Sequence, residues 1–579
     1  MNVYGSINEE REAAMRTVSI GNQRFDAIRE RNCFYIDKTG FIKEWWESED
    51  EVTLITRPRR FGKTLNMNML ECFFSNRYEN RGDLFEGLSI WQEEKYRKLQ
   101  GTYPVIFVSF ADVKQRNYED AVTKIKSILG EVYRQYDFVC YDEVLSNQEK
   151  QLFSKVTEDM SDVTAQNALK NLSGILKKYY KKNVIILLDE YDTPMQEAYL
   201  GGYWEKFTEF IRSMFNATFK TNSYLERAVM TGITRVSKES IFSDLNNLNV
   251  VTTTSDEYTT SFGFTEEEVF HALEEGGLSQ QKNVVKEWYD GFTFGTSRDI
   301  YNPWSITSFL DKKKLGTYWA DTSSNGLIGS MIQKSSVEIK ENMELIMNGG
   351  TLEVPLDEQI IFSQLDTDEN AIWSLMIASG YLKIVSVKWM NEDGELLYEP
   401  IYSLDITNRE VRTMFIKMFS GWFKRDTSNY NGFVKALLSC NLEEMNYYMN
   451  KVALATFSSF DTGNHPSDAS EPERFYHGFV LGLLVELRER YEVSSNRESG
   501  LGRYDVMLIP KKDEKTAFVL EFKVHNPGKE NTLEDTVQSA LRQIEDKKYD
   551  ELLQERGVKP EDIRHYGFAF EGKEVLIGN

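Results

Sequence analysis

Cysteine is scarce in this sequence, with only four among 579 residues. Cys33, Cys72, Cys140 and Cys440 are scattered along the chain, and no two of them form a C-x-x-C spacing. This pattern argues against a disulfide framework and against a zinc knuckle. We therefore expect a protein of the reducing cytoplasm.

Long apolar runs are missing as well. Residues 1–17 are polar and acidic and contain no apolar core of a signal peptide. No later stretch reaches the ~18 uninterrupted apolar residues of a membrane-spanning helix. We expect neither secretion nor a membrane partner, which again predicts a cytoplasmic protein.

Positive charge is in deficit, because 68 lysines and arginines face 91 aspartates and glutamates, for a net charge of −23. This balance excludes the uniformly basic surface of a nonspecific DNA coat, so any nucleic-acid contact has to be local. Hydrophobic residues make up 41% of the chain, as in an ordinary folded protein. Its length predicts about two to four domains.

Four short runs of branched apolar residues predict buried strands in the first half of the chain. They are Val52–Thr56, Val105–Phe110, Val184–Leu188 and Ala228–Thr231. Between them, Leu65–Phe74 and Tyr118–Tyr136 show helical periodicity. Alternating strands and helices indicate an α/β fold class with a parallel sheet covered on both faces.

The segment RPRRFGKT, residues 57–64, lies between the first predicted strand and a helix that begins near Lys63. Strand, loop and helix in this order are typical of a P-loop, where backbone N–H groups meet phosphate oxygens. Lys63 is placed to reach the β and γ phosphates, and the Thr64 hydroxyl is a ligand for Mg²⁺. Arg57 stands where the motif has its first glycine, so a chance G-K-T in a turn is the alternative interpretation.

Adjacent carboxylates end the third predicted strand in VIILLDEYD. We expect Asp189 to hold the Mg²⁺ shell through water and Glu190 to polarise the water that attacks the γ phosphate. A solvated strand end is the alternative, which the upstream P-loop disfavours. After the fourth strand, Thr231 or Thr234 are candidates for sensing the γ phosphate and Arg235 for a charge-stabilising finger. Simple capping of the strand by these residues is equally compatible with the pattern.

A second group of charged residues lies near the C-terminus, where Asp505 precedes one predicted strand and AFVLEFKV forms the next. Glu521 and Lys523 share a strand face, and the intervening hairpin turn returns Asp505 beside them. Asp505 and Glu521 are therefore candidate Mg²⁺ ligands and Lys523 a candidate for orienting water, the D and E-x-K pattern of metal-dependent nucleases. A buried structural ion pair is the alternative. Gln543 on the following helix adds a polar contact.

Stretches along nearly the whole chain resemble bacterial AAA-ATPase-like proteins that carry a C-terminal PD-(D/E)XK nuclease-superfamily domain. The ATPase part is represented by ITRPRRFGKT, LLDEYD, FYIDKT and YNPWS, and the nuclease part by FYHGFVLGLL, GRYDVMLIP, VLEFKV, ALRQIEDKKY and HYGFAF. The resemblance implies that Arg57 is a family variant of the loop. It also implies that Arg59 and Arg60 lie near phosphate.

The same resemblance bears on the nuclease motif. The proline that precedes the first acid of the nominal motif is replaced by Tyr504, which puts activity in more doubt than fold. Such nucleases often carry an acid on their first helix, and Glu473 and Glu486 are the candidates. Roles in defence against phage or mobile DNA are suggested by the architecture, as an analogy.

Three domains are predicted. Residues 1–254 form an AAA-like P-loop ATPase core, 255–465 a helical lid and middle region with a hairpin around Asn391–Gly394, and 466–579 a restriction-endonuclease-like PD-(D/E)XK domain. A turn-rich linker is predicted at Thr462–Glu473.

The expected function is ATP binding and hydrolysis coupled to a metal-dependent nuclease that processes DNA. A nucleotide-gated binding or signalling protein with an inert nuclease fold is the alternative. The expected cofactors are ATP and Mg²⁺, with Mn²⁺ as an option at the nuclease site; RNA as substrate and a homo-oligomer stay open. Nucleotide-binding candidates are Arg59, Arg60, Phe61, Gly62, Lys63, Thr64 and Asp189, and catalytic candidates are Glu190, Asp505, Glu521 and Lys523. Metal-ligand candidates are Thr64, Asp189, Asp505 and Glu521, and a DNA-facing basic surface is expected from Arg542, Lys547 and Lys548 with Lys523.

Overall fold

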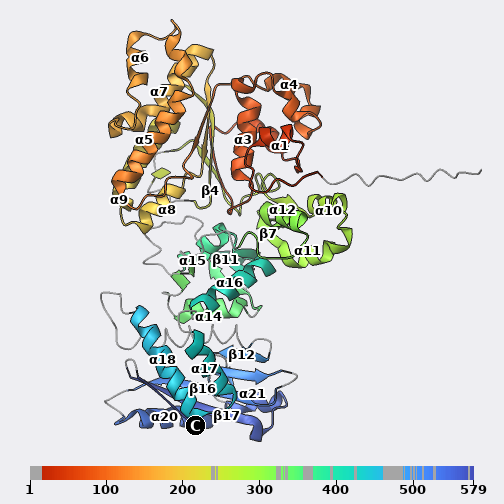
Figure 1. Ribbon diagram of the computed structural model, residues 1–579, viewed down its shortest axis with the longest axis vertical. Helices are drawn as coiled ribbons and strands as arrows, with labels where there is room; N and C mark the ends of the chain where they lie inside the picture. Colours follow the sequence, from red (N-terminus) through yellow and green to blue (C-terminus); the bar gives the residue numbers. More distant parts are fainter. Residues whose placement is uncertain are drawn as a thin grey trace, which may run out of the picture. The chain divides into compact units, whose positions relative to one another are not determined.

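The fold is taken from a computed structural model of the chain (Figure 1). It describes residues 16–579 except 236–240, 243–244, 321–327, 330, 333–334, 336, 348, 357–369, 391–395, 423–426, 461–486, 488–489, 496–497, 500–501, 504, 512–513, 526–529 and 572–573. The chain divides into two compact units, residues 1–323 with 351–411 and residues 324–350 with 412–579. The predicted linker at Thr462–Glu473 lies outside the described residues, as do Glu473, Glu486 and Tyr504.

A five-stranded parallel sheet organises the first unit, in the order β2-β3-β4-β1-β5. Its strands are β1 Val52–Thr56, β2 Val105–Ser109, β3 Val184–Asp189, β4 Leu225–Gly232 and β5 Leu248–Val251. The first four match the four predicted strands, and the α/β fold class is confirmed. Every residue of β1 and β3 is buried, as expected for a sheet covered on both faces.

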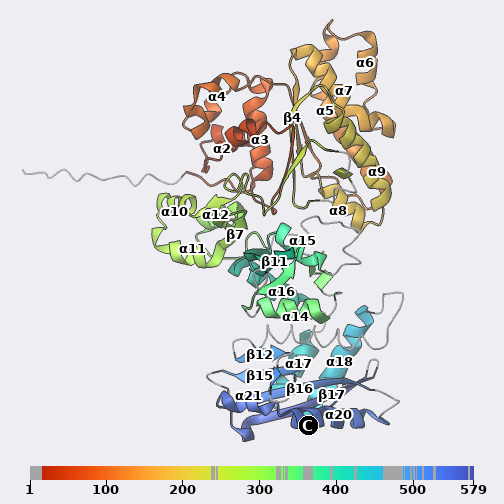
Figure 2. The same cartoon turned by 180° about the vertical axis from the view of Figure 1, so that it is seen from behind.

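Helices cover both faces of this sheet (Figure 1, Figure 2). One face carries α1 Phe25–Glu30, α2 Gly40–Glu47, α3 Lys63–Phe74 and α4 Glu94–Leu99. The other carries α5 Tyr118–Arg134, α6 Asn147–Ser154, α7 Asp162–Tyr180, α8 Thr193–Leu200 and α9 Trp204–Phe215. Side-chain caps begin several of them: Asn117 accepts the Asp120 N–H and Ser161 the Thr164 N–H. The predicted helices at Leu65–Phe74 and Tyr118–Tyr136 correspond to α3 and α5.

The middle of the chain adds helices and two small antiparallel sheets to the first unit. One sheet joins β6 Phe264–Thr265, β7 Asp290–Phe294 and β8 Ser297–Tyr301, with helices α10 Glu266–Glu275, α11 Lys282–Tyr289 and α12 Pro303–Lys312 around it. The other joins β9 Leu352–Pro355, β10 Leu382–Met390 and β11 Leu396–Ile406, beside α15 Ala371–Ala378. The strands β10 and β11 pair antiparallel, so the predicted hairpin is present, although its turn, 391–395, lies outside the described residues.

The second unit is built on a mixed sheet in the order β12-β15-β16-β17-β18. Its strands are β12 Tyr491–Ser495, β15 Val506–Pro510, β16 Ala517–Val524, β17 Ile563–Glu571 and β18 Glu574–Gly578, with a small ribbon of β13 Glu498–Ser499 and β14 Gly502–Arg503. Its helices are α14 Val337–Met347, α17 Thr427–Leu438, α18 Leu442–Phe460, α20 Leu533–Lys547 and α21 Asp550–Glu555, and α16 Arg409–Trp422 enters it from the first unit. Among the strand pairs of this sheet that the structure describes, β16 and β17 are parallel, joined by the crossover through α20, and the others are antiparallel.

Candidate functional site

The carboxyl ends of three neighbouring parallel strands bring the predicted nucleotide residues together. In register, Ile55 of β1 pairs with Thr231 of β4, and β4 also pairs with β3, which ends at Asp189. The Thr64 hydroxyl donates to Asp189 Oδ2 at 2.8 Å, and the Thr231 hydroxyl donates to Asp189 Oδ1 at 2.6 Å. Both proposed metal ligands of this site, Thr64 and Asp189, are therefore in direct contact.

The phosphate loop has a backbone shaped for anions. Arg60 and Gly62 both have positive φ, 66° and 81°, and α3 begins immediately afterwards at Lys63. The positive φ at Gly62 is what requires glycine there, since no neighbouring atom lies within 4 Å of an added Cβ. The first amides of α3 and the left-handed residues before it form a concave set of N–H donors, which suits a phosphate.

Lys63 is held inside the loop. Its ammonium donates to the carbonyl oxygens of Arg57 and Pro58, each at 2.8 Å, and the side chain is buried. Burial lowers the pKa of Lys63, and the nearby carboxylates of Glu190, Asp192 and Asp189 oppose that shift. To contact a phosphate, Lys63 has to exchange two neutral carbonyls for an anion, which is a favourable exchange for a buried cation.

The acidic pair at the end of β3 is split between two environments. Asp189 is fully buried, and burial raises its pKa against the hydrogen bonds from Thr231 and Thr64. Glu190 is half-buried, has a φ of 52°, and accepts from the Thr193 hydroxyl at 3.1 Å. A glutamate held in the left-handed region is strained, and such strain is concentrated at functional sites. Its backbone therefore turns the Glu190 side chain away from the direction that regular strand geometry would give it.

Arg57, in the place of the first motif glycine, points away from the loop. Its fully buried guanidinium donates to the carbonyl oxygens of Thr252 at 2.6 Å and Glu257 at 3.1 Å, and lies 4.7 Å from the centre of the Phe294 ring. Burial lowers the pKa of Arg57 to about 9. The side chain thus ties the start of the phosphate loop to the segment after β5.

The remaining loop residues are braced by the middle region. Asn302, the cap of α12, donates to the Arg59 carbonyl at 3.3 Å, and the Arg60 guanidinium stacks 4.2 Å from the Trp304 ring centre. Phe61 is buried against Phe292. A contact of Phe61 with nucleotide stays a prediction, and its buried ring leaves only the backbone for it. Asn302 and Trp304 of the YNPWS segment contact the loop at Arg59 and Arg60.

Asp192 was missed by the sequence analysis. It is buried, and its Oδ2 accepts from the backbone N–H of Ile233 at 2.9 Å and of Thr234 at 2.8 Å, and from the Thr234 hydroxyl at 2.9 Å. Its other oxygen has no hydrogen-bond partner among the described residues. Asp192 thus fixes the loop after β4 that carries Thr234 and Arg235. Its position three residues after Asp189, in the same motif LLDEYD, was the available signal.

The C-terminal candidates also come together. Val506 pairs with Leu520, so Asp505 lies beside Glu521. The Oδ2 atom of Asp505 accepts a hydrogen bond from the Phe522 N–H at 2.8 Å. Lys523 donates to Gln543 Oε1 at 2.8 Å, and the Gln543 amide nitrogen donates to Glu521 Oε1. Gln543 on α20 therefore bridges the glutamate and the lysine.

Glu521 is the buried carboxylate of this second site. It is only 2% exposed, and its Oε2 has no hydrogen-bond partner among the described residues. Burial and the neighbouring charge of Asp505 raise the pKa of Glu521 to about 8, against the opposing charge of Lys523. A buried carboxylate oxygen without a donor is costly unless a cation or a proton reaches it. The donor set of two carboxylates fits a divalent metal such as Mg²⁺ or Mn²⁺.

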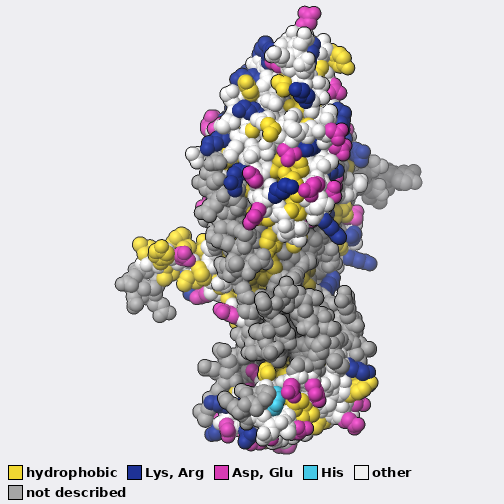
Figure 3. Space-filling model, turned by 90° about the vertical axis from the view of Figure 1, so that its left-hand side faces the viewer, with side chains coloured by type: hydrophobic (Ala, Val, Ile, Leu, Met, Phe, Trp, Pro, Cys, Tyr) yellow, Lys and Arg dark blue, Asp and Glu magenta, His cyan; other side chains and the backbone are white. Residues whose placement is uncertain are grey.

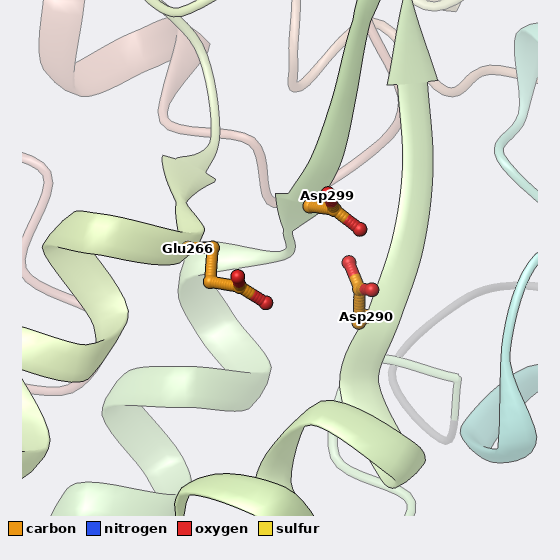
Figure 4. A group of neighbouring side chains, drawn as sticks. All are labelled: Glu266, Asp290 and Asp299. Carbon is orange, nitrogen blue, oxygen red and sulfur yellow. The ribbon is translucent and has the colours of Figure 1, made fainter.

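A further carboxylate group lies outside both sites, at Glu266, Asp290 and Asp299 (Figure 4). Lys286 forms ion pairs with Glu266 and, at 3.7 Å, with Asp299. Burial and the adjacent Asp299 raise the pKa of Asp290 to about 7. Lys286 already offsets part of the negative charge of this cluster, so we assign it no ligand.

Two parts of the chain match families of known proteins. Residues 19–242 match the family model "Predicted AAA-ATPase", and residues 471–579 match the model "PD-(D/E)XK nuclease superfamily". The chain therefore carries an AAA-ATPase-like domain and a C-terminal PD-(D/E)XK nuclease-superfamily domain, which confirms the resemblance. It is also similar to the "Uncharacterized protein in vnfD 5'region" of Azotobacter chroococcum mcd 1, with 24% identity over 402 residues, covering 69% of this chain and 68% of that protein. Among the described residues, no helix combines the length and apolarity needed to span a bilayer.

Proposed function

We propose that this protein binds and hydrolyses Mg²⁺-ATP at the phosphate loop and uses that cycle to control hydrolysis of nucleic-acid phosphodiesters at Asp505, Glu521 and Lys523. The observation that carries the ATPase half is the contact of Thr64 with Asp189 at the carboxyl ends of β1 and β3. Two sequence motifs far apart in the chain supply the two residue types that share a magnesium ion in P-loop ATPases.

The chain's own residues divide the work of the first site. Bound Mg²⁺ would neutralise charge on the β and γ phosphates. Lys63 moves from the carbonyls of Arg57 and Pro58 to the phosphates, Thr64 and Asp189 hold the metal shell, and Glu190 orients and polarises water. Arg59 and Arg60 add positive charge at the loop, with Arg60 positioned by Trp304.

The second site is proposed to hold its metal between Asp505 and Glu521. The metal would lower the pKa of the attacking water and offset charge on the scissile phosphate. Lys523 contributes a positive contact to the transition state once it leaves Gln543. The unpartnered Glu521 oxygen supports this assignment over a purely structural ion pair.

DNA is the proposed substrate, with RNA as the competing polymer to be tested. Because the chain is acidic overall, phosphate contacts have to be local, and Arg542, Lys547 and Lys548 on or beside α20 are the proposed basic surface near Lys523. We propose defence against foreign DNA as the biological role and the cytoplasm as the location. The division into three domains, with boundaries after residues 254 and 465, stays a prediction.

The second candidate function is a nucleotide-gated binding or signalling protein with an inert nuclease fold. It is favoured by Gln543, because the Gln543 side-chain amide accepts a hydrogen bond from Lys523 and donates one to Glu521, so both side chains already have a protein partner. An ATP and Mg²⁺ or Mn²⁺ assay on duplex DNA, single-stranded DNA and RNA distinguishes the two. Metal-dependent cleavage that Asp505→Ala abolishes supports the nuclease, whereas ATP turnover without cleavage of any polymer supports the binding protein.

A further inference from the structure

Lysines are concentrated along α7 and just beyond its end, in a chain that is acidic overall. Residues 163–188 contain five lysines and no aspartate or glutamate, whereas the whole chain has a net charge of −23. Basic residues in the last turn of a helix interact favourably with the helix dipole, but Lys170 and Lys182 lie outside that turn. Helix stability therefore accounts for only part of this charge. The five lysines are Lys170, Lys177, Lys178, Lys181 and Lys182.

An open pocket of about 570 Å³ lies beside these lysines, between α6, α7 and Tyr224. Leu152, Ile175 and Tyr224 give it apolar walls, and Asn171 adds a side-chain amide. Pockets that hold small ligands commonly measure about 300–1,000 Å³. The pocket therefore has room for a group of the size of one nucleotide.

The lining of this pocket is positively charged. Lys177, Lys178 and Lys181 face one carboxylate, Glu149, which pairs with Lys178 at 2.7 Å. The Lys177 ammonium donates to the neutral carbonyl oxygen of Ser223 at 3.3 Å. Figure 3 looks onto the side of the unit where Figure 1 labels α5, α6 and α7, and acidic side chains lie there among basic and hydrophobic ones. A polyanion is therefore attracted where lysines outnumber carboxylates, as they do around the pocket.

The Tyr224 ring is held in place at the pocket and is still accessible. The Tyr224 N–H donates to Asn222 Oδ1 at 3.1 Å, and the Tyr224 carbonyl accepts from the Val184 N–H at 2.9 Å. The ring packs on α7 where Gly174 has no side chain, since an added Cβ would lie 2.9 Å from it. Tyr224 is nevertheless 37% exposed. An accessible aromatic ring beside lysines is the combination on which the bases of a single strand stack.

We propose that this pocket binds one unpaired nucleotide of a single-stranded DNA, with the base against Tyr224 and the flanking phosphates on Lys177 and Lys181. The proposal rests on the proposed function, because nucleic acid is the substrate proposed there. Lys177 and Lys181 are four residues apart, about one helical turn, so they can contact successive phosphates. A duplex does not suit the pocket, because only a base outside the stack can enter a concave site. The ATPase-like part of the chain then has its own contact with the polymer.

The test is fluorescence anisotropy of the full-length protein with a labelled oligothymidylate of about 20 nucleotides in EDTA, where metal-dependent cleavage cannot occur. The variants are Lys177→Glu with Lys181→Glu, and Tyr224→Leu. The control, Lys98→Glu with Lys206→Glu, makes the same charge change at lysines that are 74% and 61% exposed elsewhere on this unit. Unchanged circular dichroism shows that the variants are folded.

The two pocket variants should weaken binding in different ways. Lys177→Glu with Lys181→Glu should bind at least 10-fold more weakly than the control. Its plot of log affinity against log salt should be less steep by about 1.4, because each phosphate contact to a single strand contributes about 0.7. Tyr224→Leu should bind about 5-fold more weakly or worse with the slope unchanged, since it removes stacking and no charge.

Photocrosslinking locates the base in the wild-type protein without any substitution. Oligothymidylate that carries 5-iodouracil should attach to Tyr224 on irradiation, as read by peptide mass spectrometry. Wild type that does not bind, crosslinks that form only elsewhere, or a charge variant that binds as the control does overturns the proposal. Displacement by AMP at equal nucleotide concentration assigns the pocket to free nucleotides, and displacement by polyglutamate assigns it to acidic peptides; either result overturns the proposal as well. Because the assay contains no metal, a failure of the protein to cleave nucleic acid leaves the expected binding unchanged.

Discussion

Asp189 and Glu521 are both carboxylates of buried strands, yet the chain completes the first environment and leaves the second incomplete. Both oxygens of Asp189 accept hydroxyl hydrogen bonds, from Thr231 and Thr64. Glu521 has one oxygen on Gln543 and one with no hydrogen-bond partner among the described residues. The described residues therefore supply a donor to each oxygen of Asp189, whereas one oxygen of Glu521 is left for the metal that we propose at the C-terminal site.

The two lysines show the same contrast in a milder form. Lys63 rests on two carbonyl oxygens of its own loop, and Lys523 rests on one amide oxygen of Gln543. Each cation is held on neutral acceptors and has to move to meet a phosphate. Substitutions at each site can show whether both movements occur.

The largest effect is expected at the lysine of the phosphate loop. Lys63→Ala should reduce tight ATP binding and hydrolysis below detection, because it removes the ammonium group that is proposed to contact the β and γ phosphates directly. Nucleotide binding and phosphate release are the measurements. Lys98→Ala, at a position 74% exposed on α4, is the control and should leave both unchanged. ATP turnover at the wild-type rate in folded Lys63→Ala protein contradicts the P-loop assignment.

At the C-terminal site, Asp505→Ala and Lys523→Ala should each abolish nucleic-acid cleavage while ATP hydrolysis persists. The first removes a proposed metal ligand, and the second removes the proposed positive contact to the transition state. Asp546→Ala on the exposed side of α20 is the matched control. Cleavage by either site variant at the rate of the control rules out the catalytic assignment.

A smaller effect is expected from Glu190→Gln, which keeps the shape of the side chain and removes the charge that polarises water. Hydrolysis should slow by about 10² or more, and Mg²⁺-ATP should stay bound. Single-turnover hydrolysis with a parallel binding titration separates the two quantities. Loss of binding would mean that Glu190, with its φ of 52°, is needed for the backbone turn and not for chemistry.

Asp192→Asn probes the loop that carries Thr234. The substitution weakens three hydrogen bonds to one oxygen without leaving a cavity, so the loop should shift slightly. We expect hydrolysis to slow between about 10- and 100-fold with ATP affinity nearly unchanged. Asp159→Asn, at an exposed position, is the control. Equal losses of affinity and rate would instead assign Asp192 to nucleotide binding.

The smallest effect is expected at the carboxylate cluster of Glu266, Asp290 and Asp299 (Figure 4). The folded-state pKa of Asp290, about 7, lies above its ordinary value of 3.8, so the folded protein holds a proton that the unfolded chain releases. This carboxyl group therefore lowers stability progressively as pH rises from about 4 to 7. Asp290→Asn should raise the melting temperature relative to wild type over that window, by less than about 4 °C because the group is half exposed. A constant difference across the window contradicts the shift.

The strands of the nucleotide domain could be predicted from sequence because branched apolar runs are a local signal. The predicted Val52–Thr56 strand coincides with β1, and α3 begins at Lys63 as expected. The strand β7 was not predicted, because Gly291 and Gly295 suggest a break between helices. Its pairing with β8 depends on the tertiary fold and leaves no local signal in the sequence.

The candidate sites show the same division between local and tertiary information. Spacing alone brought Glu521 and Lys523 to one strand face, and Gln543 could be named from the following helix. The direction of the Arg57 side chain could not be predicted, since its acceptors at Thr252 and Glu257 lie about two hundred residues away along the chain. Asp192 was missed for a related reason: its donors come from the loop after another strand.

Cleavage by the wild-type protein, Lys63→Ala and Asp505→Ala, measured side by side with Mg²⁺ or Mn²⁺ and with or without ATP, tests the coupling of the two sites most directly. The proposed function predicts metal-dependent cleavage by wild type that ATP changes, cleavage by Lys63→Ala that no longer responds to ATP, and no cleavage by Asp505→Ala. Failure of the wild-type protein to cut duplex DNA, single-stranded DNA or RNA under all of these conditions contradicts it.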